Sequence, residues 1–124
     1  MQMVLIAIFG ALGCLLRYFL SLKITQWFGS AYPYGILLVN ILGCFLIGLL
    51  AMLLIHKWQA DIIWRTAIMI GFLGGFTTFS SFSFDAIQML EHGAWLKAGS
   101  YILLSVVLCL IATFLGILIG KGLQ

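Results

Sequence analysis

The chain has 124 residues and a mass of 13.7 kDa; 65% of its residues are hydrophobic and only 7% are charged. A soluble domain of this length exposes about half of its residues. A mean hydropathy of +1.25 therefore excludes that class and indicates an integral membrane protein. The net charge of +3 is too small and too scattered for a nucleic-acid surface, so we expect membrane lipid as the surrounding partner.

At about 20 residues per spanning helix, the chain has room for four spans in a single transmembrane domain, residues 1–124, with no domain outside the bilayer. The first apolar run has no charged leader, so we expect it to stay as a helix. Gly29 and Gly93 suit helix ends, Pro33 suits a first helical turn, and Asp61 suits an N-cap. We predict spans at residues 3–27, 33–55, 62–90 and 95–119.

The third span contains the run Gly74–Ser83, in which two glycines precede a series of hydroxyl and phenylalanine side chains. Glycines weaken a helix and hydroxyls are polar groups at membrane depth, so we predict a break at residues 74–78. Phe76, Phe79 and Phe82 recur every three residues, which predicts one helix face shared with the hydroxyls. Phenyl edges carry partial positive charge and hydroxyls donate hydrogen bonds. This face is therefore interpreted as part of an anion permeation path.

The fourth span carries a second polar stripe, because Tyr101, Ser105, Cys109 and Thr113 follow one another at intervals of four. Small residues at this spacing, such as Gly116 and Gly120 further along, are typical of close helix packing, and we interpret these two glycines in that way. Tyr101 and Thr113 add bulk or polarity, which favours pore lining. For Ser105 packing and pore lining are both open.

Two polar residues stand alone within apolar spans. Asn40 is the only carboxamide of the second span, and its NH₂ group can donate to a passing anion or to a neighbouring helix. Arg17 lies in the first span, where its guanidinium can concentrate anions at a pore vestibule or extend to the lipid headgroups.

The basic residues at the two ends of the spans are nearly balanced. Lys57, Arg65 and Lys121 belong to one end, and Lys23 and Lys97 to the other, with Arg17 left aside. Orientation follows the Lys/Arg bias of short loops, so this balance predicts insertion in both directions and an antiparallel dimer. A parallel dimer, or one orientation fixed by other signals, is the alternative.

Residues 74–83 resemble the GGxTTFSTF signature of the Fluc (CrcB) family of fluoride channels, and Gly13-x-x-x-Arg17-Tyr18 and Asn40-x-x-Gly43 resemble further family patterns. The resemblance covers the whole chain, and the third-span motif is long and specific. Ser81 stands where the common pattern has threonine, which preserves the hydroxyl.

This resemblance implies an all-α membrane protein, with its third helix broken near the centre, that forms an antiparallel dual-topology homodimer with two fluoride pores. It implies a sodium ion on the dimer axis, held by the backbone carbonyls of Gly74 and Thr77 from each subunit. The pore residues expected from the motifs and the resemblance together are Asn40, Phe79, Ser81, Phe82, Tyr101, Ser105 and Thr113, with Arg17 at a vestibule.

The expected function is passive efflux of fluoride across a bacterial inner (plasma) membrane, which protects against fluoride toxicity. The sequence has no nucleotide-binding motif and no proton-carrying acid in the path. Small multidrug transporters have this length and topology but need an acid in the first span, where this chain has Arg17. An assembly subunit of a larger complex would leave the phenylalanine and hydroxyl run unexplained. No catalytic grouping of residues is present, so we do not expect an enzyme.

Overall fold

The computed structural model describes residues 1–124 and is entirely helical. Four helices are long and apolar enough to cross a membrane, which confirms the predicted all-α fold with four spans. The predicted boundaries agree closely with these spans, which are Gln2–Phe28, Tyr34–Lys57, Ile62–Glu91 and Trp95–Gly122.

Two of the four spans are regular α-helices and two are composite. The first span is α1 (Gln2–Phe28) and the fourth is α6 (Trp95–Gly122). The second is α2 (Tyr34–Met52) continued by the π-helical turns of η1 (Leu53–Lys57). The third consists of α3 (Ile62–Thr66), the π-helical η2 (Ala67–Leu73), α4 (Gly74–Phe76) and α5 (Phe79–Glu91).

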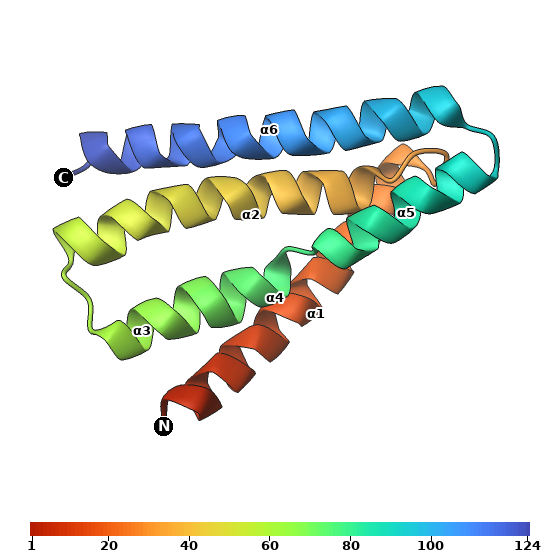
Figure 1. Ribbon diagram of the computed structural model, residues 1–124. Coiled ribbons are helices and arrows are strands. Elements are labelled where there is room, and N and C mark those ends of the chain that lie inside the picture. Colours follow the sequence, from red (N-terminus) through yellow and green to blue (C-terminus); the bar gives the residue numbers. More distant parts are fainter.

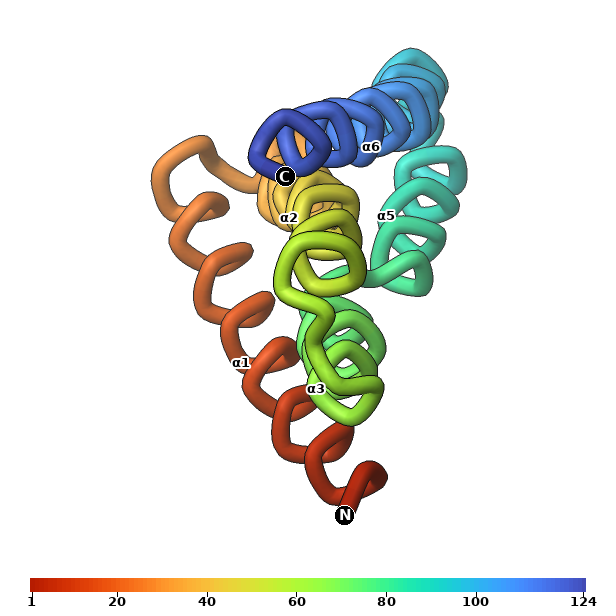
Figure 2. Tube along the Cα trace, turned by 90° about the vertical axis from the view of Figure 1, so that its left-hand side faces the viewer, coloured from red at the N-terminus to blue at the C-terminus, as the bar shows by residue number.

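The spans are arranged around α2. Figure 1 shows α2 and α6 side by side and running in the same direction, with both chain termini at one end of the molecule. Figure 2 shows α1 and α5 on either side of α2. The third span changes direction between α4 and α5, and this change separates α5 from the line of α3 and α4.

The helix ends follow the local signals of the sequence. Gly29 ends α1 at a φ of 85°, a left-handed conformation that glycine adopts without steric cost, and its N–H donates to the carbonyl of Thr25 at 2.8 Å. The Asp61 carboxylate accepts from the N–H of Ile63 at 3.3 Å and caps α3. Gly93 turns the chain towards α6 at a φ of 75°.

The break in the third span is shorter than predicted. Only Thr77 (φ −89°, ψ 158°) and Thr78 (φ −151°, ψ 121°) are extended, whereas Gly74–Phe76 remains helical. Gly75 serves close packing instead of unwinding, because a Cβ atom there would overlap the carbonyl oxygen of Gly10 in α1. The prediction of a break was correct, but its assignment to the whole of residues 74–78 was wrong.

The prediction that three phenylalanines share one helix face was also wrong. Phe76 lies before the break, is 1% exposed and packs with Ile24 and Val39. Phe79 and Phe82 lie after the break in α5. The sequence spacing assumed continuous helical rotation, and two extended residues interrupt that rotation.

Helices α2 and α6 pack so closely that their backbones are in contact at glycine residues. A Cβ atom on Gly48 would overlap the carbonyl oxygen of Thr113, and one on Gly116 would overlap the carbonyl oxygen of Phe45. A Cβ atom on Gly120 would lie 2.6 Å from the Cβ atom of Met52. The interpretation of Gly116 and Gly120 as packing residues is therefore confirmed.

Replacement of Gly116 by alanine is expected to destabilise the protein by about 1–3 kcal/mol, because the new methyl group meets backbone atoms that cannot rotate away. The matched control is Gly99→Ala in the same helix, where a Cβ atom would have no neighbour within 4 Å. Unfolding in a denaturing detergent series measures both changes. Equal stability of the two variants would contradict the packing role.

The basic residues separate into two ends, as the sequence predicted. The Nζ atom of Lys57 donates to the carbonyl of Leu123, beside the C-terminus. The Nζ atom of Lys97 donates to the carbonyl of Ala31 at 3.3 Å, at the other end of the bundle.

Little of the surface of α1 is covered by the rest of the protomer, since only Gly13 and Ile24 are buried in this helix. Its apolar side chains therefore face surroundings outside the protomer.

Candidate functional site

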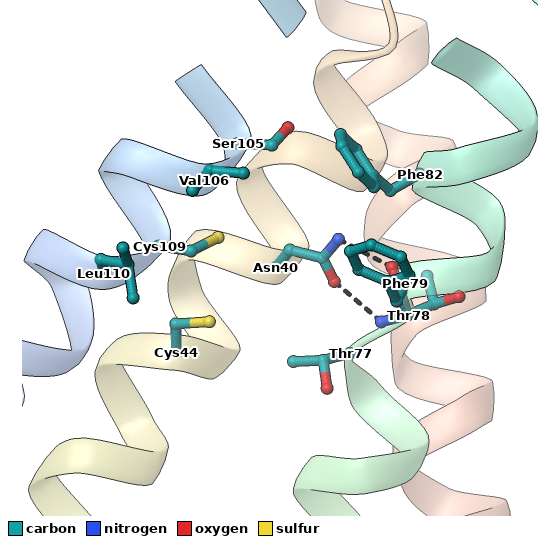
Figure 3. A pocket seen from close by; sticks show the side chains of 10 residues that line it. All are labelled: Asn40, Cys44, Thr77, Thr78, Phe79, Phe82, Ser105, Val106, Cys109 and Leu110. Carbon is teal, nitrogen blue, oxygen red and sulfur yellow. Dashed lines mark hydrogen bonds between the residues drawn. The ribbon is translucent and has the colours of Figure 1, made fainter. Parts of the chain in front are cut away.

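The break in the third span faces a pocket of about 300 Å³ between α2, α5 and α6 (Figure 3). The pocket brings together four of the predicted pore residues, Asn40, Phe79, Phe82 and Ser105, together with Thr77 at the break. Its remaining lining residues are Cys44, Thr78, Val106, Cys109 and Leu110. No acidic side chain lines it.

Asn40 in α2 binds the extended residues of the break through two hydrogen bonds. Its Nδ2 atom donates to the carbonyl of Thr78 at 2.9 Å, and the N–H of Thr78 donates to Asn40 Oδ1 at 2.8 Å. Both bonds are drawn in Figure 3. The interhelical hydrogen bond that the sequence left open is therefore present, in a double form. A carboxamide carries two N–H donors, so one remains for the pocket.

Thr78 was not predicted as a site residue, and it has two roles here. Its backbone pairs with Asn40, and its hydroxyl accepts from the N–H of Ser81 at 3.1 Å as the N-cap of α5. The Thr78 hydroxyl also bonds the hydroxyls of Ser80 and Ser81, at 3.1 and 3.2 Å. Ser81 is thus part of this cap and does not line the pocket. A threonine before an apolar helical segment was the available signal.

The two phenylalanines of α5 differ in burial. Phe79 is 76% exposed, whereas Phe82 is 8% exposed and their ring centroids lie 5.2 Å apart. Phe82 packs in turn on Tyr101, with centroids 5.2 Å apart. Tyr101 is fully buried behind Phe82 and outside the pocket lining, and its hydroxyl donates to Asp85 Oδ2 at 3.4 Å.

The polar stripe of α6 does not lie entirely along the pocket. Ser105 lines it, and the Ser105 hydroxyl is buried without a hydrogen-bond partner in the protein. Thr113 lies two turns further along α6, outside the lining, and its hydroxyl donates to the carbonyl of Cys109 at 3.0 Å. The structure therefore groups Ser105 with the pocket and separates Thr113 from it.

Arg17 lies beside the break. Its Nη1 atom donates to the carbonyl of Thr77 at 3.5 Å, and its Nη2 atom donates to Cys14 Sγ at 3.3 Å. The face of α1 that carries Arg17 also carries Gly13, where a Cβ atom would overlap the carbonyl oxygen of Phe72. Close packing on the third span thus brings this guanidinium to the break instead of to the end of the span.

Two backbone carbonyls lose their helical partners at the break. The N–H of Thr78 would bond Gly74 in a continuous helix, but it donates to Asn40. The N–H of Ser81 would bond Thr77, but it donates to the Thr78 hydroxyl. Gly74 is exposed, with open space beside its Cα atom. The Gly74 carbonyl has no donor within the protomer, whereas the Thr77 carbonyl accepts from Arg17 Nη1 at 3.5 Å; both are hard oxygen donors.

The arrangement suits a small anion better than a cation or a covalent reaction. Ring edges, an amide N–H and an unpartnered hydroxyl surround one pocket, and all of them present partial positive charge. The chain has no cluster of three or more His, Cys, Asp or Glu side chains that could hold a metal ion.

Comparison with known proteins agrees with the sequence motifs. The family model described as "CrcB-like protein, Camphor Resistance (CrcB)" matches residues 4–117. The chain is 51% identical over 122 residues to proteins named "Fluoride-specific ion channel FluC" from Geobacter sp. (strain M21) and Citrifermentans bemidjiense, with 98% of each chain covered. It is 45% identical to a Rhizobium etli protein of the same name, again with 98% coverage of both chains. The chain belongs to the CrcB family.

Proposed function

We propose that this protein is a fluoride-selective ion channel of a bacterial plasma membrane that lets fluoride flow passively out of the cytoplasm and so protects against fluoride toxicity. The observation that carries the proposal is the pocket, in which Asn40, Ser105 and two phenylalanine rings meet without an acidic side chain. The names of the bacterial relatives, all of them ion channels, support the same function and agree with the expectation that the chain is not an enzyme.

Fluoride is small and strongly hydrated, so a selective path must replace its water with other donors. The free N–H of Asn40 and the hydroxyl of Ser105 are such donors, since neither has a protein acceptor. The edges of Phe79 and Phe82 add partial positive charge in an apolar wall. Selectivity against the larger chloride ion would require the assembled path to be too narrow for it.

Tyr101, Ser81 and Thr113 belong to this proposal at the margins of the pocket. Tyr101 supports the Phe82 ring and connects it to Asp85. Ser81 stabilises the start of α5, and Thr113 continues the polar face of α6 beyond Cys109. Tyr101 and Thr113 lie beyond the pocket in opposite directions along α6, and Ser81 lies at the start of α5.

We propose further that two copies assemble as an antiparallel homodimer with two pores, each lined by both subunits. Phe79 is 76% exposed in one protomer, although a phenylalanine ring at a pore is expected to be covered. A second copy would supply that cover. The near balance of basic residues at the two ends favours insertion in both directions.

The carbonyls of Gly74 and Thr77 fit a sodium ion between the two copies. Both are neutral oxygen donors without a helical partner, and Gly74 opens to the outside of the protomer. Two copies would contribute four such oxygens. The ion would supply positive charge between the subunits and fix the two breaks relative to each other.

Purified protein in liposomes tests the function. We expect rapid fluoride release, followed with a fluoride electrode, and no chloride release in parallel vesicles. Empty liposomes give the leak rate. Equal release of both anions would contradict selectivity, and no release from a folded dimer would contradict the channel itself.

The proposed sodium site is tested by repeating the fluoride measurement after sodium is replaced by N-methylglucamine. Removal of sodium is expected to slow fluoride release.

A further inference from the structure

Two of the three cysteines of the chain line the pocket. Cys44 projects from α2 and Cys109 from α6, whereas Cys14 is exposed on α1 beside Arg17. Figure 3 shows both sulfur atoms directed into the pocket, one above the other, on the side opposite Phe79. All three thiols are free, and nothing in the proposed anion path requires a thiol.

The helix packing places these two thiols face to face. Helices α2 and α6 run in the same direction, and Gly48 in α2 contacts the carbonyl of Thr113 in α6. Cys44 and Cys109 each precede a member of that contact by four residues, so they lie one turn earlier on the same two faces. The pair is therefore fixed by backbone contact between two rigid helices.

We propose that Cys44 and Cys109 form a two-thiolate site for a soft metal ion, such as Hg²⁺ or Ag⁺, and that an ion bound there closes the anion path. Soft ions select thiolate ligands, and two thiolates suffice for ions that prefer linear coordination. Binding of Hg²⁺ replaces the two thiol protons with two metal–sulfur bonds and releases both protons, with no change of oxidation state.

The predicted effect on transport follows from the position of the pair. The same pocket contains Asn40 and Ser105, the two polar groups with hydrogen-bond capacity left for an anion. A metal ion between the thiols ties α2 to α6 beside those groups and occupies space that a permeating ion needs. This part of the inference rests on the proposed channel function, whereas the metal site itself does not.

Binding is tested in detergent on the full chain, in a Cys14→Ser background that leaves only the pocket thiols. We expect one Hg²⁺ per chain, detected by thiolate-to-mercury absorption in the ultraviolet and retained against an excess of a monothiol. Adding Cys44→Ser or Cys109→Ser to this background leaves one thiol, so retention should be lost. Equal retention by the single-thiol variants, or none by Cys14→Ser, would overturn the site.

Flux is measured separately in liposomes made from the same variants. Liposomes with the Cys14→Ser protein should release fluoride before Hg²⁺ is added. Release should stop after one equivalent of Hg²⁺ and resume when a dithiol removes the metal. Liposomes with the single-thiol variants should release fluoride after the monothiol wash. Hg²⁺ binding that leaves fluoride release unchanged would overturn the proposal that the metal closes the anion path. Absence of fluoride release before any metal is added would instead contradict the proposed channel function and leave the binding result intact.

Discussion

Replacement of Asn40 by leucine is expected to reduce fluoride efflux to the rate of empty liposomes. The change removes both hydrogen bonds to the backbone of Thr78 and the free N–H that faces the pocket. A buried backbone group without a partner costs about 1–3 kcal/mol, so the break should lose its fixed geometry as well as a donor. Phe79 is the next residue after Thr78, so the placement of its ring should change as well.

The matched control is Cys44→Ala, one turn further along the same helix. Cys44 lines the same pocket but makes no hydrogen bond to the break. Its replacement should retain fluoride efflux close to that of the original protein. Fluoride electrode traces, together with size-exclusion profiles of both variants, separate loss of transport from loss of folding. Normal efflux in Asn40→Leu would show that neither the donor nor the fixed break is needed.

The second large effect is expected at the phenylalanines of the pocket. Phe79→Ile and Phe82→Ile each remove a ring whose edge carries partial positive charge, so each should block fluoride efflux without preventing assembly. Phe79 is 76% exposed in the protomer, so its replacement should leave the fold unchanged. Phe82 packs with Leu37, Ala86 and Tyr101, and its replacement should cost less than the roughly 3–5 kcal/mol of a Phe→Ala change.

Phe84→Ile provides the control for the two phenylalanine variants. Phe84 lies in the same helix and is 64% exposed, but it does not line the pocket. We expect its fluoride release to match that of the original protein in the liposome assay. Retained fluoride permeation in both Phe79→Ile and Phe82→Ile would remove the rings from the proposed mechanism.

The sequence predicted the membrane spans well because hydropathy and helix ends are local properties. Gly29, Asp61 and Gly93 act at the helix ends where their types indicated. The π-helical residues of η1 and η2 were not predicted, since their composition does not differ from that of an ordinary apolar helix. The alternation of regular and π-helical turns depends on packing between spans.

The site was predicted less completely, because it depends on contacts between distant residues. The partner of Asn40 is Thr78, 38 residues further along the chain, and only the relative position of two helices selects it. The same dependence explains why Phe76 was assigned to the wrong face. Spacing within one span assumes a continuous helix, and Thr77 and Thr78 interrupt it. Cys109 belonged to the predicted stripe with Ser105, but Cys44 carried no local signal for a shared pocket.

The open carbonyls of Gly74 and Thr77 have a consequence for the lifetime of a single protomer in the bilayer. The Gly74 carbonyl has no hydrogen-bond donor within the protomer, and the Thr77 carbonyl accepts only from Arg17 Nη1 at 3.5 Å. An unsatisfied backbone group in hydrocarbon costs several kcal/mol. In the proposed dimer, a second copy and an ion would relieve that cost together, so polar groups would favour association as well as apolar area. Dilution in lipid, which separates many helix pairs, should therefore be an inefficient way to obtain monomers of this protein.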